Sequence, residues 1–274
     1  MASSSSLLVK KFNPTKATTK NCNMLFIGKR NSGKSVLIRD MLYHLNRSKI
    51  PRIVVFSGTE DSTGYYGQYV PDAFIFSTLD LDVLEKIVEK QKKLTSDKKF
   101  GRIPADTDTR LVLLLDDVGF DKKVLKSTTI REVMMNGRHL GITFMLALQY
   151  SMDISPDLRT NIDYVFSMRD NIPKNVAKLY ENFFGVFETL AQFRTVFEQC
   201  TQNYEVLCLD NTNPCAPLGE SVQWYKAKLD RAFHFGSKES WEFHKSRYLT
   251  EEEREGMPVQ ETGKKRGLVI HKSR

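Results

Sequence analysis

The chain alternates between short apolar runs and longer amphipathic stretches from about residue 21 to about residue 210. Apolar runs of about 4 to 8 residues bounded by Gly, Pro, Asn or Asp are typical of buried strands. The predicted strands are Met24–Ile27, Arg52–Ser57, Ala73–Ser77, Leu111–Asp116, Ile142–Leu148 and Tyr164–Met168, with a late strand in "YEVLCLD" before residue 211. The predicted helices are Gly33–Leu45, Leu81–Leu94, Ser127–His139, Pro156–Asn161 and Pro173–Phe184.

Strands this apolar are usually buried on both faces, and strands that alternate with helices indicate parallel βαβ units. The pattern therefore predicts an α/β protein, a three-layer αβα sandwich around a mostly parallel sheet of five or more strands. The parallel units occupy residues 21–210. Residues 1–20, rich in Ser, Thr and Lys, are predicted to be a flexible basic arm, and residues 211–274 a peripheral C-terminal extension with a basic tail.

Two further segments affect this outline. Residues 96–110, "SDKKFGRIPADTDTR", are polar with Gly and Pro and predict a surface loop. Residues 224–248 are rich in aromatic side chains. These rings could stack on the bases of single strands, but large aromatics are mostly packing residues, so we expect them to pack the extension onto the body.

Charge adds a candidate partner to this fold. The net charge is +8, and eight Lys or Arg residues precede the first acidic residue, Asp40. The last fourteen residues, "ETGKKRGLVIHKSR", contain five Lys or Arg and one Glu. Basic ends on a globular body suit a polyanion, although Lys-rich tails can also serve solubility alone. No charge-free run approaches the about 20 residues that span a bilayer, and the N-terminus lacks a secretory signal, so we expect a soluble intracellular protein.

The stretch "LFIGKRNSGKSVLI" contains the chemistry-bearing motif GxxxxGK[ST], at residues 28–35, between a predicted strand and a predicted helix. The glycines let the backbone wrap around phosphate oxygens, and the loop N–H groups and helix N-terminus form an anion site. Lys34 is assigned to the β/γ-phosphates of ATP and Ser35 to Mg²⁺. Lys29 and Arg30 occupy variable positions and are assigned to solvent or a subunit interface. The nucleotide-binding residues are Gly28, Asn31, Ser32, Gly33, Lys34, Ser35 and Val36.

The run "RLVLLLDDVG" places two acids at the end of a buried strand. Asp116 is assigned to the Mg²⁺ ion, directly or through water, and Asp117 to the attacking water as general base. Two acids at a strand end can also be a solvated cap, but beside a complete phosphate-binding motif they predict hydrolysis of a nucleoside triphosphate.

The segment "NGRHLGITFMLALQ" supplies a third element. Gln149, at the end of a predicted strand, is a candidate to hold the γ-phosphate or the lytic water. Arg138 is a candidate to neutralise transition-state charge on a neighbouring subunit's nucleotide. Taken singly, each residue has a structural interpretation that is at least as ordinary: Gln149 as the cap of a strand, and Arg138 as a cation favoured by the dipole at a helix C-terminus. Arg159 and Arg169 are rival candidates for the arginine that acts in trans.

With "GKRNSGKS", "LVLLLDD", "NGRHLGITFMLALQ" and "LRTNIDYVFSMRD" in this order, the chain resembles the virion DNA-packaging ATPases of nucleocytoplasmic large DNA viruses. These are poxvirus-type members of the HerA–FtsK class of P-loop NTPases. The resemblance covers about residues 21–210. It implies an ATP-driven, usually hexameric ring that translocates double-stranded DNA into a capsid, at the virus assembly site inside the host cell and in the virion. The second strand-end acid of the wider class is usually Glu, so the shorter Asp117 reaches its water less directly.

Two alternatives stay open at this point. A P-loop enzyme of another class, such as a small-substrate kinase, would need a lid and an acceptor pocket, and no Arg-rich lid is evident in the sequence. A non-catalytic nucleic-acid-binding virion protein would not need the intact set of Lys34, Ser35 and Asp116.

Overall fold

The computed structural model describes residues 7–118, 124–150 and 154–247. Eight strands form one sheet in the order β3-β2-β4-β5-β1-β6-β7-β8. The six strands from β3 to β6 are parallel, β7 is antiparallel to β6, and β8 is antiparallel to β7. The strands are β1 (Asn23–Ile27), β2 (Arg52–Ser57), β3 (Ile75–Phe76), β4 (Leu111–Asp116), β5 (Ile142–Leu148), β6 (Tyr164–Ser167), β7 (Glu205–Asp210) and β8 (Val222–Lys226). The expected mostly parallel sheet is confirmed.

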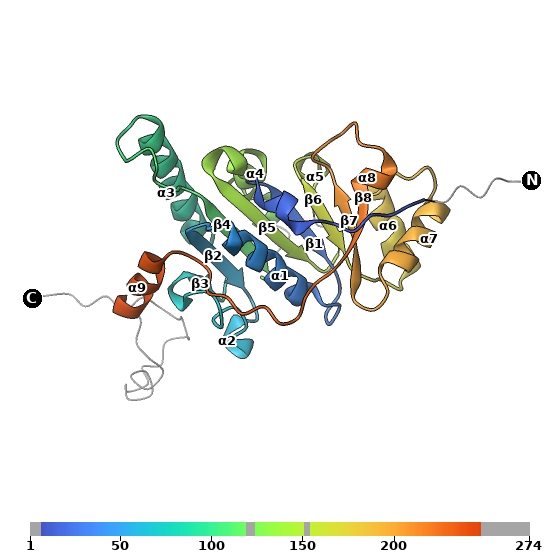
Figure 1. The fold of residues 1–274 in the computed structure, drawn as a ribbon, viewed down its shortest axis with the longest axis horizontal. Coiled ribbons are helices and arrows are strands. Elements are labelled where there is room, and N and C mark those ends of the chain that lie inside the picture. The colour runs from blue at the N-terminus through green and yellow to red at the C-terminus, as the bar shows by residue number, and fades with distance from the viewer. Residues whose placement is uncertain (1–6, 119–123, 151–153, 248–274) are drawn as a thin grey trace, which may run out of the picture.

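Helices cover both faces of this sheet (Figure 1). One face packs against α3 to α7, and the other packs against α1, the short helix η1 (Pro14–Thr18) and the tyrosine-rich loop after β2. This is the expected three-layer αβα sandwich. The helices are α1 (Lys34–Arg47), α2 (Glu60–Thr63), α3 (Leu81–Lys99), α4 (Thr128–Asn136), α5 (Pro156–Arg159), α6 (Pro173–Asn182), α7 (Leu190–Cys200), α8 (Leu218–Ser221) and α9 (Lys238–Arg247), with η2 (Asp72–Phe74), η3 (Val124–Lys126) and η4 (Gly137–Leu140).

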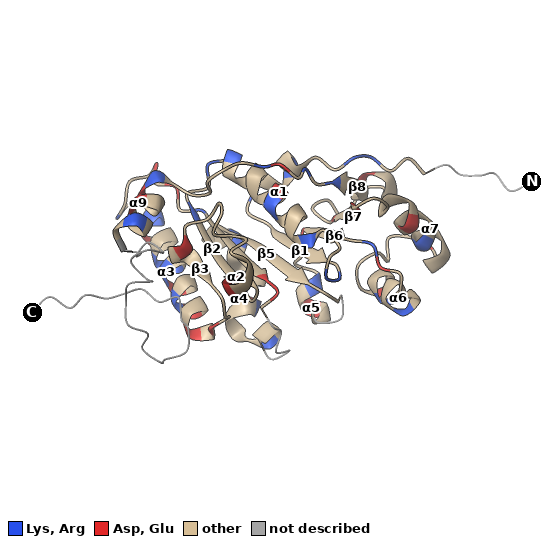
Figure 2. Ribbon diagram, turned by 90° about the horizontal axis from the view of Figure 1, so that it is seen from below, with Lys and Arg blue, Asp and Glu red and all other residues tan. Residues whose placement is uncertain are grey.

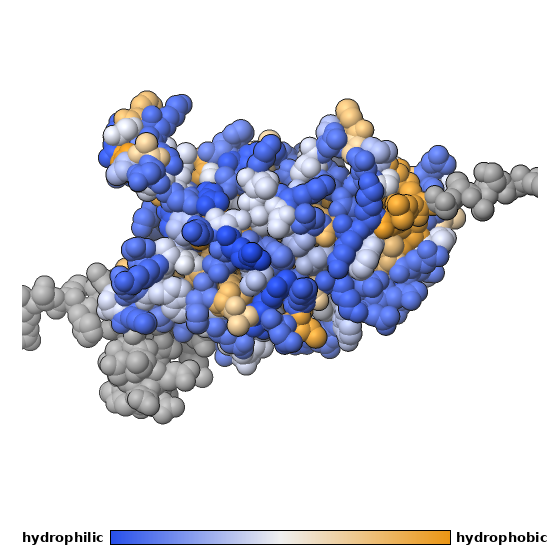
Figure 3. Space-filling view, in the orientation of Figure 1, coloured by the Kyte–Doolittle hydropathy of each residue, from blue (hydrophilic) through white to orange (hydrophobic). Residues whose placement is uncertain are grey.

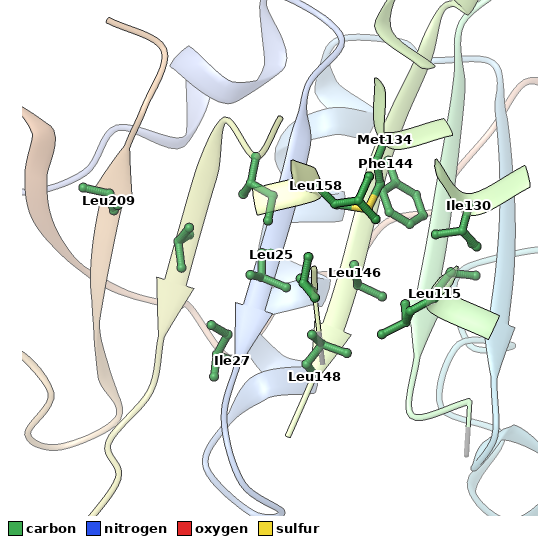
Figure 4. Close-up of a cluster of buried hydrophobic side chains, with 14 of the residues drawn as sticks. Leu25, Ile27, Leu115, Ile130, Met134, Phe144, Leu146, Leu148, Leu158 and Leu209 are labelled. Atoms are coloured by element: carbon green, nitrogen blue, oxygen red, sulfur yellow. The ribbon is translucent and has the colours of Figure 1, made fainter. Parts of the chain in front are cut away.

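The core explains why the central strands read as continuous apolar runs. Every residue of β1, β4 and β5 is buried, because both faces of these strands are covered by helices. Figure 4 shows one side of this core, where Leu25 on β1, Leu115 on β4 and Leu146 on β5 lie beside Ile130 of α4 and Leu158 of α5. The central strands are thereby held rigidly, and whatever follows their carboxyl ends is positioned by the sheet.

The N-terminal segment differs from its expectation as a flexible arm. Residues 11–20 pack on the body: the Phe12 ring is buried, and it makes edge-to-face contacts with Tyr164, Phe166 and Tyr225. The Phe12 backbone N–H also donates to the carbonyl of Trp224. The expectation of a mobile arm rested on the polarity of the segment. Burial of the Phe12 side chain, which contributes about 1.5 to 3 kcal/mol to stability, holds the segment on the body despite that polarity.

The C-terminal extension also begins later than residue 211. Strand β8 joins the central sheet beside β7, so residues up to 226 belong to the body. Beyond β8, buried Phe235 and the Phe233 ring against Tyr69 show that the aromatic residues of this segment pack, as expected. The predicted loop at 96–110 is also shorter, because α3 continues to Lys99. Helix α7, which the sequence did not predict, precedes β7. The charged stretch "TEEEREG" and the basic tail lie outside the described residues.

A buried carboxylate on α1 anchors the C-terminal segment. Asp40 is 0% exposed, and its oxygens accept hydrogen bonds from the Tyr225 hydroxyl (2.5 Å), the Lys228 backbone N–H (3.2 Å) and Arg231 Nε (2.6 Å). Buried charges are stable only when paired and hydrogen-bonded in this way. The network ties residues 225–231 to the helix that opens at Lys34.

The surface carries charge of both signs. Lysine and arginine positions are interspersed with aspartate and glutamate on α3, α6 and α7 (Figure 2). The face seen in Figure 3 is mostly hydrophilic, with apolar residues gathered at the end of the molecule where α7 and α8 lie. Within the described part of the chain, no helix is long and apolar enough to cross a membrane.

Candidate nucleotide-binding site

The GxxxxGK[ST] motif forms the loop between β1 and α1. It lies at the carboxyl end of a central parallel strand, the edge at which α/β sheets bind ligands. Gly33 has φ 88° and Asn31 φ 63°, so the loop turns through left-handed conformations just before α1 begins. A Cβ at Gly28 would lie 2.5 Å from Ser32 Oγ and 2.8 Å from the Met168 sulfur. A side chain at residue 28 would therefore force Ser32 and Met168 to move where the loop leaves β1.

The motif lysine is held against the strand-end acid. Lys34 is buried in the first turn of α1, and its Nζ lies 3.9 Å from Asp116 Oδ1. Ser35 follows, with its backbone carbonyl accepting a hydrogen bond from the Tyr65 hydroxyl at 3.1 Å. The loop thus meets the end of β4 through Lys34, and the contact depends on the order in which the strands lie.

Asp116 is nearly inaccessible, with one oxygen engaged and one not. The Tyr66 hydroxyl donates to Asp116 Oδ2 at 2.6 Å, whereas Oδ1 accepts no hydrogen bond from the described residues. Burial raises the pKa of Asp116, while the Tyr66 hydrogen bond and Lys34 act in the opposite direction. A buried carboxylate oxygen without a hydrogen-bond donor, 3.9 Å from the Lys34 ammonium, has the chemistry to bind a hard cation such as Mg²⁺.

Asp117 and Gln149 contact each other. Gln149 Nε2 donates to Asp117 Oδ1 at 3.1 Å. Asp117 has φ 47°, an unusual conformation for a residue other than glycine. Its carbonyl oxygen would lie 2.1 Å from a Cβ on Gly58, so the turn after β2 closes directly over it. The structure therefore joins Asp117, the candidate general base, to Gln149, the candidate for the γ-phosphate or the lytic water.

The three candidate arginines lie in different places. Arg138 lies at the opposite edge of the sheet, 3.8 Å from Asp163, and lines a polar cavity of about 530 Å³ there. Arg159 is engaged within the chain: Nε donates to the Ile154 carbonyl and Nη1 to Asn182 Oδ1. Arg169 lies at the carboxyl edge, beside the chain's own phosphate-binding loop. Arg138 therefore lies away from the GxxxxGK[ST] loop of its own chain, with Asp163 as its acidic neighbour.

Lys29 differs from its assignment to solvent or a subunit interface. Its Nζ lies 2.6 Å from Asp170, and the side chain is one-third exposed. Asp170 follows β6, so this ion pair joins the loop to the neighbouring strand. Because partly exposed pairs contribute about 0 to 1 kcal/mol, Lys29 orients the loop more than it stabilises the fold.

Residues that the sequence analysis missed form the wall opposite the loop. Tyr65 and Tyr66 come from "GYYGQYV" after β2, and buried Glu60 holds that segment by accepting the N–H groups of Tyr66 (3.0 Å) and Gly67 (2.8 Å). The density of tyrosine and glycine in this segment was the available signal. No periodicity, however, relates residue 66 to residue 116, and the two side chains meet because β2, which precedes the tyrosine-rich segment, pairs with β4.

The chain is similar in sequence to known viral proteins. The sequence pattern of the family described as poxvirus A32 protein matches residues 9–217. Protein L437 of Acanthamoeba polyphaga mimivirus is 34% identical over 231 residues, covering 84% of this chain and 80% of its own length. Protein 075L of Invertebrate iridescent virus 6 is 34% identical over 239 residues, covering 84% of this chain and 88% of its own length.

Among solved structures, the fold is similar to that of the genome packaging NTPase B204 from Sulfolobus turreted icosahedral virus 2, determined in complex with AMP. The TM-score is 0.54 with 18% sequence identity, over 80% of this chain and 100% of that one. At this identity the likeness concerns the fold, and it confirms the expected P-loop NTPase architecture.

Proposed function

Because the chain belongs to the poxvirus A32 protein family, we propose that it is an ATPase that drives packaging of viral double-stranded DNA into the capsid. The observation that carries the proposal is the meeting of three separate segments at one sheet edge. Lys34 lies 3.9 Å from Asp116, and Gln149 donates to the adjacent Asp117. Phosphate grip, metal-binding acid and water-positioning pair are the parts that ATP hydrolysis needs. The related NTPase B204 has been solved with AMP and with ATP-γ-S.

The loop and α1 bind the triphosphate in this proposal. Backbone N–H groups of residues 28–35 and the N-terminus of α1 would surround the phosphate oxygens, and Lys34 would neutralise the β/γ-phosphates. Ser35 and the Oδ1 atom of Asp116, which accepts no hydrogen bond from the described residues, are the groups that would hold Mg²⁺. The ion, when bound, supplies charge neutralisation on the phosphates.

Asp117 and Gln149 act on water. Asp117 would accept a proton from the attacking water, and the 3.1 Å hydrogen bond from the Gln149 amide supports this role by orienting the Asp117 carboxylate. The strained backbone of Asp117, pressed against Gly58, fixes the direction of the short side chain. This rigidity suits a general base that is one methylene shorter than Glu.

A ring of identical subunits, most simply a hexamer, completes the site. Arg138 at the opposite sheet edge would reach the nucleotide of the next subunit. Double-stranded DNA would be held through its phosphates without base reading. The mixed charges on α3, α6 and α7 do not mark a DNA face on those helices (Figure 2). Viral capsid proteins are the expected docking partners, at the assembly site in the infected cell and in the virion.

The test is ATP hydrolysis by the full chain with and without long double-stranded DNA. We expect DNA to stimulate turnover, Lys34→Ala to abolish it, and the control Lys86→Ala, at an exposed position of α3, to leave it unchanged. Turnover that is indifferent to DNA would contradict the motor and favour an enzyme of another P-loop class. No turnover in any oligomeric state would favour a non-catalytic nucleic-acid-binding protein.

The trans role of Arg138 has its own test. Mixing Arg138→Ala subunits with Lys34→Ala subunits creates interfaces in which an intact Lys34 faces an intact Arg138. We expect these mixtures to regain part of the activity that each variant lacks alone. Absence of rescue at every mixing ratio would refute the assignment.

A further inference from the structure

We propose that the turn between α7 and β7 holds the base of the bound nucleotide, with the ring of Tyr204 as its stacking platform. This inference rests on the nucleotide site proposed above and names the part of that site that recognises the nucleoside.

The sheet order determines which way the nucleotide extends. Asp116, Asp117 and Gln149 follow β4 and β5, which lie on one side of β1. The reacting γ-phosphate must face these groups, so the α-phosphate, ribose and base leave the loop in the other direction. On that side lie the carboxyl end of β6 and the amino end of β7.

A cavity is present at that position. It has a volume of about 660 Å³ and is bounded by residues 29–32 of the phosphate-binding loop, by residues 201–205, and by Arg169 and Asn171. This volume lies in the range of about 300 to 1,000 Å³ that is typical of small-molecule sites. The same cavity therefore adjoins both the phosphate grip and the α7–β7 turn.

Tyr204 is placed at the border of this cavity. The residue is 72% exposed, and its ring lies against the loop, because a Cβ built on Gly33 would be 3.3 Å from Tyr204 Cδ1. An exposed ring in this position offers a π-face to a purine that emerges from the phosphate-binding loop.

The backbone conformation of the turn supports a ligand-binding role for the Tyr204 ring. The Glu205 N–H donates to the Gln202 carbonyl at 2.8 Å, and the two central residues, Asn203 and Tyr204, have φ 50° and 62°. Positive φ at both central positions corresponds to a type I′ turn, whose second position favours glycine. Tyrosine occupies it at a conformational cost that glycine would not carry, and such strain is concentrated at ligand sites.

This geometry makes Tyr204→Gly an informative variant, because it removes the ring and also removes the conformational cost of a non-glycine residue at this turn position. We expect it to weaken binding of ATP-γ-S, measured by calorimetry with Mg²⁺, by about tenfold, while binding of inorganic tripolyphosphate is unchanged. The melting temperature should stay the same or rise. Tyr204→Trp should keep the affinity for ATP-γ-S. The matched control is Lys49→Gly, another non-glycine residue with positive φ (56°), in the turn between α1 and β2; it should leave the affinity unchanged.

The other outcomes overturn the proposal in distinguishable ways. If Tyr204→Gly binds ATP-γ-S as tightly as the wild type, the ring does not contact the base. If it loses affinity for tripolyphosphate equally, the turn shapes the phosphate loop and not a base site. If the wild-type chain binds neither ATP-γ-S nor tripolyphosphate, the nucleotide site itself fails, and the base platform with it.

Discussion

Removing one hydroxyl group, in Tyr66→Phe, should change the pH dependence of catalysis. The Tyr66 hydroxyl is the donor to Asp116 Oδ2 at 2.6 Å, and the second oxygen of that carboxylate accepts no hydrogen bond from the described residues. Burial already raises the pKa of Asp116, and the Tyr66 hydrogen bond counteracts this by favouring the charged form. Its loss must therefore raise the pKa further.

The size of the effect follows from the bond. A hydrogen bond to a charged group contributes about 1.5 to 3 kcal/mol, and one pKa unit corresponds to about 1.4 kcal/mol. In the wild type, protonated Asp116 still keeps part of its hydrogen bond with Tyr66, so only part of this energy shifts the pKa. We therefore expect the acidic limb of the kcat/KM profile for ATP to shift to higher pH by about one unit in Tyr66→Phe. Activity should be lost most at low pH and should recover as the pH rises and Asp116 ionises.

The assay is steady-state ATP hydrolysis from pH 5 to 9, with Tyr69→Phe as the control. Tyr69 is a buried ring in the same cluster, and its hydroxyl has no hydrogen-bond partner among the described residues, so its removal should leave the profile unchanged. A uniform loss at every pH in Tyr66→Phe, or identical profiles for the two variants, would refute the role of Tyr66 as the residue that keeps Asp116 ionised.

Three further substitutions test how residues near the site contribute to the stability of the fold. Gly58→Ala puts a Cβ 2.1 Å from the carbonyl of Asp117; we expect a loss of about 1 to 3 kcal/mol in urea unfolding and lower kcat, whereas Gly185→Ala, with nothing within 4 Å, should be nearly neutral. Asp40→Ala removes the acceptor of three hydrogen bonds and should lower the free energy of unfolding in urea by about 3 to 5 kcal/mol. A loss below about 1 kcal/mol would contradict the anchoring role of Asp40. Burial lowers the pKa of His44, so its contribution to stability is present above about pH 6.5 and is lost as the pH falls; His44→Gln should flatten the decline in unfolding free energy between pH 7.5 and 5.5, and an unchanged decline would count against it.

Much of the nucleotide site could be predicted from the sequence because its signals are local. The phosphate-binding loop is one continuous segment whose glycines act within a few residues, so strand, loop and helix could be located from "LFIGKRNSGKSVLI" alone. The pair Asp116–Asp117 and Gln149 each follow an apolar run. Since the carboxyl ends of parallel strands share an edge, the fold class already predicted that these residues lie at the same edge of the sheet as the loop.

Errors arose where polarity was used as evidence of mobility or of a boundary. The N-terminal segment is polar overall, yet Phe12 is buried. Residues after 211 lack helical periodicity, yet β8 pairs with β7 through a register from Glu205 with Lys226 to Leu209 with Val222. A five-residue strand at a sheet edge leaves too weak a pattern in the sequence to be distinguished from a loop.

The sequence by itself determined the βαβ class, the position of the GxxxxGK[ST] loop and the acids at the strand ends, because each depends on neighbours along the chain. The tertiary structure alone decided which distant groups complete them: Tyr66 on Asp116, fifty residues apart, the Lys29–Asp170 pair, and the Tyr204 ring beside Gly33. The physical reason is that these contacts depend on the lateral order of the strands, with β1 between β5 and β6. Hydrophobic periodicity shows that a strand is buried on both faces, but it does not encode which strand lies beside it.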